Sequence, residues 1–137
     1  MSYHYRILPH PADVRLEIIA SSKKELFEGA LKGMASILSQ EKGLNNYEVK
    51  KQIEVQSLDL NTLLVDFLSE VLAKSDIYHC VFRKIKILKM NDKSILAELE
   101  GKKVKRFDEE IKAVTYHGLQ IKQNKKGEYE AIILFDI

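Results

Sequence analysis

The chain has few of the residues that mark secreted or multidomain proteins. Its single cysteine, Cys80, allows no internal disulfide and fits a reducing compartment, and we expect it as a core residue at the start of a strand. Only two prolines and six glycines occur, and no low-complexity linker or fixed-period repeat marks a domain boundary. A single domain spanning residues 1–137 is therefore expected.

Long apolar runs and a strong net charge are also missing. No apolar stretch approaches the ~20 residues of a membrane span. Residues 1–6 have no apolar signal-peptide core, so we expect a cytoplasmic protein with no membrane partner. The net charge of +2 is too small to indicate nucleic-acid binding from charge alone.

One short run, residues 102–106, is strongly basic: Lys-Lys-Val-Lys-Arg. It is a solvated loop or a contact for phosphate or an acidic surface. The aromatic residues of an RNA-binding sheet are not interleaved with it, so direct nucleic-acid binding is expected to be weak or absent.

Two segments of the sequence are predicted to form amphipathic helices. The first opens with a capping box from Ser22 to Glu25, and the second opens near Asp59. Apolar residues then recur at helical spacing, which is far more typical of a core than of a ligand pocket. In the first helix they are Leu26, Phe27, Ala30, Leu31, Met34, Ile37 and Leu38, and in the second Leu60, Leu63, Leu64, Phe67, Leu68, Val71 and Leu72.

Most of the remaining chain alternates apolar and polar residues with the period of a half-buried strand. The expected strands are residues 5–8, 14–18, 53–55, 85–87 and 95–99, with a final hairpin joining 119–122 to 129–135. Lys84 and Lys86 are expected across from Glu98 and Glu100. The fold class is therefore α+β, with two helices packed on one face of a mostly antiparallel β-sheet.

Carboxyl groups from the two ends of the chain form the first candidate site. The apolar run 131–135 leads into Asp136 and the carboxylate of Ile137, and Asp13 precedes the 14–18 strand. If the Asp13 turn lies alongside, three carboxyl groups converge, and they repel one another unless a cation or a basic partner lies between them. The ordinary alternatives are a frayed, solvated chain end and an Asp13 side chain that bonds its own turn.

Two other groups of residues are candidates for chemistry. Residues 112–117, from Lys112 to His117, combine an amine, a hydroxyl, a phenol and an imidazole, which suit proton transfer or oxyanion contacts. Asp66 and Glu70 lie four apart on the second helix, as a solvated shoulder or as an acidic ridge for a basic partner. No nucleophile elbow, phosphate-binding glycine loop or zinc spacing of histidines is present, so no motif requires catalysis.

Four blocks in this order, spread over the whole chain, resemble the archease family. They are His10-Pro11-Ala12-Asp13-Val14; Asp59 followed by Leu63-Leu64-Val65-Asp66-Phe67-Leu68-Ser69-Glu70; Lys112-Ala113-Val114-Thr115-Tyr116-His117; and Leu134-Phe135-Asp136-Ile137. Three features depart from the family pattern: Pro11, Arg15 and a shorter, more basic 101–110 stretch. Around that stretch, only Glu110 and Lys112 are carried over.

The resemblance implies a compact archease-like domain and a metal site formed by Asp13, Asp136 and the Ile137 carboxylate. Oxygen ligands suit a hard divalent cation, Ca²⁺ first, with Mg²⁺ or Mn²⁺ as alternatives. The resemblance further implies partner-binding or ligand-orienting roles, which we carry over to these residues: His10, Asp66, Glu110, Lys112 and His117.

The function implied by the resemblance is that of a non-catalytic activator. Its partner would be the RtcB-type RNA-splicing ligase, whose guanylylation and multiple turnover in tRNA splicing it promotes. One alternative is a small metal-dependent phosphoester hydrolase that uses the same carboxylates, with His117 or His10 as base. Another is a chaperone-like modulator of a tRNA methyltransferase.

Overall fold

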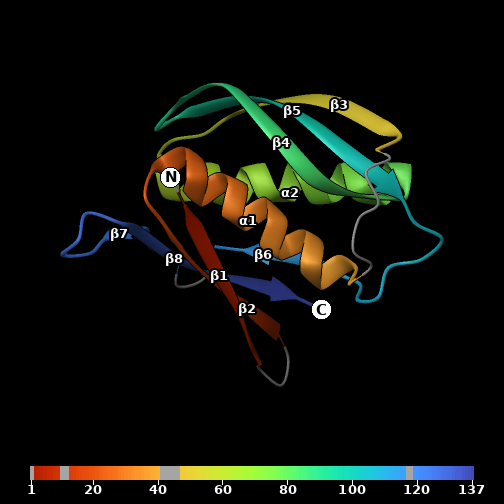
Figure 1. Ribbon diagram of the computed structural model, residues 1–137, viewed down its shortest axis with the longest axis horizontal. Coiled ribbons are helices and arrows are strands. Elements are labelled where there is room, and N and C mark those ends of the chain that lie inside the picture. Colours follow the sequence, from red (N-terminus) through yellow and green to blue (C-terminus); the bar gives the residue numbers. More distant parts are fainter. Residues whose placement is uncertain (1, 10–12, 41–46, 117–118) are drawn as a thin grey trace.

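The computed structural model describes residues 2–9, 13–40, 47–116 and 119–137 (Figure 1). In these residues the elements follow in the order β1 (Tyr3–Pro9), β2 (Asp13–Ala20), α1 (Lys23–Leu38), β3 (Val49–Gln56), α2 (Leu60–Tyr78), β4 (Cys80–Asn91), β5 (Ser94–Lys103), β6 (Ala113–Thr115), β7 (Lys122–Gln123) and β8 (Tyr129–Asp136).

The two helices form a layer between two antiparallel sheets (Figure 1). Within the described residues, the five-stranded sheet has the order β1-β2-β8-β6, with β7 also pairing with β8, and the three-stranded sheet has the order β3-β5-β4. The α1 helix packs on β1, β2 and β8 of one sheet and on β4 of the other. The predicted α+β class is confirmed, but the strands divide between two sheets instead of forming one.

The two-sided burial of α1 explains the second sheet. Besides its main apolar stripe, α1 buries Gly29, Gly33 and Ala35, so that little of its circumference is exposed. A helix that is apolar around most of its surface needs cover on both sides. Gly33 lies so near β2 that a Cβ atom there would come within 2.6 Å of both Leu16 methyl groups.

Both predicted helix starts are confirmed by their capping bonds. The Ser22 hydroxyl accepts a hydrogen bond from the Glu25 N–H at 3.2 Å, and the Glu25 carboxylate accepts from the same hydroxyl at 2.9 Å. The Asp59 carboxylate accepts from the Thr62 N–H at 2.8 Å. Cys80 is the buried first residue of β4, as predicted, and burial raises the pKa of its thiol to about 11.

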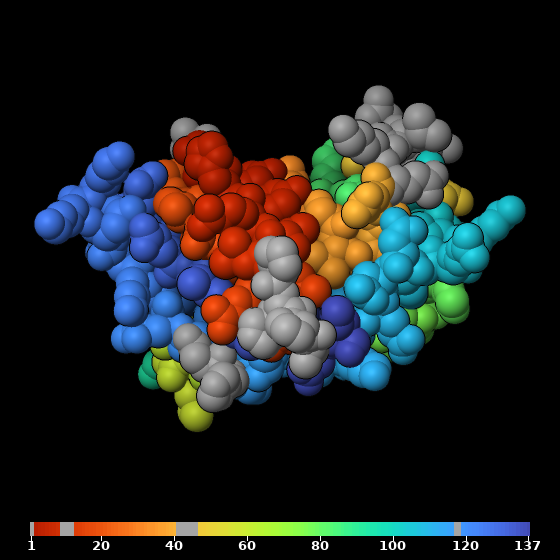
Figure 2. Space-filling view, turned by 90° about the horizontal axis from the view of Figure 1, so that it is seen from below, coloured from red at the N-terminus to blue at the C-terminus, as the bar shows by residue number. Residues whose placement is uncertain are grey.

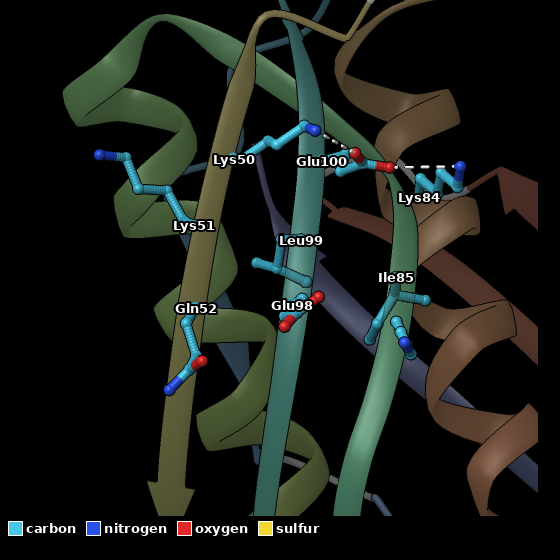
Figure 3. Close-up of a pocket in the computed structure, with 9 residues that line it drawn as sticks. Lys50, Lys51, Gln52, Lys84, Ile85, Glu98, Leu99 and Glu100 are labelled. Atoms are coloured by element: carbon cyan, nitrogen blue, oxygen red, sulfur yellow. Dashed lines mark ion pairs between the residues drawn. The ribbon is translucent and has the colours of Figure 1, made fainter.

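The predicted pairing of lysines with glutamates on β4 and β5 is also confirmed. Lys84 lies opposite Glu100, and Lys86 lies opposite Glu98. Figure 3 shows the Glu100 carboxylate between the ammonium groups of Lys50 and Lys84, at 3.4 and 3.3 Å. The pKa of Glu100 is lowered, chiefly by the hydrogen bond from Lys84. These residues line a shallow hollow of about 510 Å³ on the three-stranded sheet, away from the carboxyl groups at the ends of β2 and β8.

No helix in the described part of the chain has both the length and the apolar character needed to cross a membrane.

Candidate functional site

The register of the five-stranded sheet brings Asp13 and Asp136 together. The two residues are direct partners across the β2–β8 ladder. Leu16 and Ile18 of β2, and Ile133 and Phe135 of β8, are buried on the side that faces the helices. Because side chains alternate along a strand, Asp13 and Asp136 share the opposite side of the sheet.

That side of the sheet is seen in Figure 2, where the atoms of β1, β2 and β8 lie at the surface. Asp13 is half-buried there and Asp136 is exposed. Ala113 of β6 is the partner of Asp136 on its other side. A methyl group at that position takes up little space, so the face beside the Asp136 carboxylate stays accessible.

Asp136 is held by backbone contacts on both sides. The Asp136 carbonyl accepts a hydrogen bond from the Lys112 N–H at 2.7 Å, so residue 136 is tied to strands on both sides. The side chain of Ile137 is half-buried and packs against the core.

The donor set at this position fits a hard cation. Two like charges directly opposite each other in a ladder are unfavourable, and a cation bound by both removes the repulsion. Among the described residues, no three His, Cys, Asp or Glu side chains gather in one cluster. A complete coordination sphere here therefore needs further oxygen donors, such as a terminal carboxylate, backbone carbonyls or water.

The structure places Asp66 in a hydrogen-bonded network within the chain. Its carboxylate accepts from the Ser57 hydroxyl at 2.6 Å and, through a short bond, from the Tyr116 hydroxyl. The bond to the carboxylate holds the phenol proton and raises the pKa of Tyr116. Asp66 is half-buried, and its bond to Tyr116 connects α2 to the end of β6. Glu70 instead forms an ion pair with Lys74 at 3.3 Å.

Strand β6 is absent from the strands predicted from sequence, although it borders the site. It has three residues, of which only Val114 is buried, so its alternation is too short to be distinctive. Its pairing with β8, a strand that comes later in the chain, is recognisable only in three dimensions. Lys112 N–H at one end and the Tyr116 hydroxyl near the other hold this segment in place.

The remaining candidates are not brought together around the aspartates. Glu110 is exposed and lies near Asp76 of α2, whose pKa is raised first by burial and then by the Glu110 charge. The Lys112 side chain is exposed. His10 and His117 lie outside the described residues.

The fold and the facing aspartates define a small α+β protein with an anionic, oxygen-donor site at one end of an open sheet face. A sequence model described as the "Archease protein family (MTH1598/TM1083)" matches residues 5–137. The chain is 32% identical to "Protein archease" of Methanosarcina barkeri over 141 residues, covering 97% of this chain and 95% of the relative. It is 31% identical to "Protein archease" of Pyrococcus furiosus, covering 98% and 96%.

Solved structures agree with these matches. The solution structure of Methanobacterium thermoautotrophicum protein 1598 has a TM-score of 0.78 at 25% identity, covering 97% of this chain and 98% of the other. A Thermotoga maritima crystal structure, described as "an archease, possible chaperone", has a TM-score of 0.66 at 23% identity, covering 98% and 99%, and supports the fold. The chain belongs to the archease family. These relatives are named as archeases or as a possible chaperone, and none of the names is that of an enzyme.

Proposed function

We propose that this protein activates an RtcB-type RNA-splicing ligase, promoting ligase guanylylation and multiple turnover in tRNA splicing. In this proposal Asp13 and Asp136 hold a divalent cation, Ca²⁺ first and Mg²⁺ or Mn²⁺ as alternatives. The observation that supports it most directly is the pairing of these aspartates on an open sheet face in a chain of the archease family. The terminal carboxylate of Ile137 is the proposed third ligand.

A divalent cation supplies charge neutralisation for a transferring nucleotidyl group. The residues of this chain would hold the carboxylate ligands in position. Asp136 is tied between β2 and β6, so its carboxylate and that of Asp13 are presented together. The Lys112 and Glu110 side chains are exposed on the segment leading into β6, where a docked partner can reach them. His10 and His117 are proposed partner contacts from their sequence blocks.

Ligase guanylylation in the presence and absence of this protein tests the proposal. The RtcB-type ligase is incubated with labelled GTP, and covalent nucleotide on the ligase is followed with time. We expect wild-type protein to speed labelling and to raise the number of ligation turnovers per ligase. Equal rates with and without the protein, at saturating cation, would reject the activator function.

Two alternatives predict different results with the purified protein. A metal-dependent hydrolase would turn over phosphoesters without the ligase and would lose this activity in Asp13→Asn. A chaperone-like role, which the description of the Thermotoga structure supports, would instead appear as altered solubility or assembly of a tRNA methyltransferase.

A further inference from the structure

The end of α2 and the 104–111 loop that follows β5 lie side by side at the right of Figure 1, and apolar and basic side chains are exposed there. Ile77 is 70% exposed and Tyr78 is 38% exposed, although both are large apolar residues. Lys105 and Arg106 are exposed on the loop beside them. We define the α2-end patch as Ile77, Tyr78, Lys103, Lys105, Arg106 and Phe107.

The loop of this patch is fastened to the end of the helix. His79, the C-terminal cap of α2, has a left-handed backbone with φ of 50°, and its carbonyl accepts from the Val104 N–H at 2.9 Å. The His79 ring stacks on Phe107, with centroids 6.1 Å apart and planes 17° apart. Lys105 and Arg106 therefore extend from a loop held on both sides, at Val104 and at Phe107.

The charges of the loop are available to a partner. In the part of the chain that the structure describes, neither Lys105 nor Arg106 forms an ion pair, whereas Lys50 and Lys84 are both engaged by Glu100. Arginine and tyrosine beside an exposed aliphatic residue are typical of the centres of protein–protein interfaces. We propose that the α2-end patch docks an acidic, partly apolar segment of a partner protein.

The same residues are a poor match for single-stranded nucleic acid. Stacking of bases needs an open aromatic face, but His79 and Phe107 cover each other and the Lys51 ammonium lies 4.1 Å from the centre of the Tyr78 ring. The exposed Ile77 side chain has no role in a phosphate contact.

The patch continues toward the candidate cation site. The 104–111 loop leads directly to Lys112, whose N–H bonds the Asp136 carbonyl. In Figure 2 the dark-blue C-terminal atoms lie beside the cyan and light-blue atoms of this segment. The loop that carries Lys105 and Arg106 is thus joined through Lys112 to the strand that carries Asp136. The docking chemistry is independent of the proposed function, but naming the ligase as the partner rests on it.

A binding assay without the ligase tests the docking chemistry. The probe is a short fluorescein-labelled peptide that alternates glutamate with leucine, followed by fluorescence anisotropy. We expect Lys105→Gln/Arg106→Gln to weaken binding about five-fold, and Ile77→Gln to weaken it as well. The matched control is Lys125→Gln/Lys126→Gln, which removes the same charge from the exposed β7–β8 turn and should leave affinity unchanged.

Three results would overturn the proposal. They are no binding by the wild-type protein at about 50 mM salt, equal weakening by the control variant, and tighter binding of an oligouridylate of matched charge. Circular dichroism of each variant separates loss of binding from loss of fold.

The ligase assay then identifies the partner. If the ligase supplies the acidic segment, Lys105→Gln/Arg106→Gln should need several-fold more protein for half-maximal activation, with the same maximum and the same cation-induced thermal shift. Normal activation by this variant would exclude the ligase as the docked partner while the proposed function stands. No activation by the wild type would reject the proposed function. The peptide assay would still show whether the α2-end patch binds an acidic, partly apolar segment.

Discussion

Replacing Asp13 by asparagine removes one of two facing charges while keeping the size of the side chain. In the metal-free protein the change should be neutral or stabilising, because like charges directly opposite in a ladder are unfavourable by about 0.2–1 kcal/mol. Two unit charges about 5 Å apart in a water-like medium give about 0.8 kcal/mol, in the same range. Asp136 is exposed, so the water-like value is the appropriate one.

With the cation bound, the wild-type protein should become more stable than Asp13→Asn. At a concentration about 100 times the dissociation constant, a ligand stabilises the native state by about 2.7 kcal/mol. For a chain of 137 residues this corresponds to a rise in Tm of about 8–10 °C. If loss of the Asp13 charge weakens binding about 100-fold, the same cation concentration should raise Tm by only about 1–2 °C.

Thermal melts with chelator and with added Ca²⁺, Mg²⁺ or Mn²⁺ measure both effects. The matched control is Glu130→Gln, on the same face of β8 but opposite Ile19 at the far end of the ladder. Glu130 accepts a hydrogen bond from the Asn124 amide at 3.1 Å, and glutamine can accept it too. If Asp13→Asn and wild type show the same cation-induced shift, Asp13 is not a ligand and the proposed mechanism has no cation.

Three further changes test other parts of the structure. Residues added after Ile137 should abolish ligase activation with an unchanged circular dichroism spectrum, and normal activation by a C-terminally tagged protein would remove Ile137 from the site. Ser75→Ala should raise the free energy of unfolding by about 1 kcal/mol in denaturant titrations, because the buried Ser75 hydroxyl has no hydrogen-bond partner among the described residues; a comparable loss would contradict this. The raised pKa of Tyr116 means that its bond to Asp66 stabilises the protein below the ordinary phenol value of 10.0 and is lost as pH rises through the raised value. The stability difference between wild type and Tyr116→Phe should therefore shrink in melts above about pH 10, and a constant difference would show that Asp66 does not hold this proton.

Local sequence predicted the helices and the central hairpin of the three-stranded sheet. Ser22 and Asp59 bond the first turns of their helices, and the apolar stripes that follow are buried. Lys84 faces Glu100 across the β4–β5 ladder. Each of these features depends on residues that are close in sequence or joined by a short turn, and the period of the pattern identifies the element.

Assembly into two sheets was not predicted, because it depends on how much of a helix is covered. Gly29 and Gly33 carry no side chain, so the apolar stripe of α1 alone gave no sign that strands pack on both of its sides. Strand β6 was missed for a related reason, since three residues paired with a distant strand leave no periodic pattern.

The candidate site shows the same division. The sequence by itself determined that Asp13 precedes one apolar strand and that Asp136 ends another, and the family blocks linked the two. Only the tertiary structure decided that these strands are neighbours in antiparallel register, with the two aspartates as direct partners. The tertiary structure also brings the Tyr116 hydroxyl to the Asp66 carboxylate, although the two residues are 50 positions apart. Register between distant strands is set by burying Leu16, Ile18, Ile133 and Phe135 together against the helices, and a shift of one residue would turn those side chains to the open face.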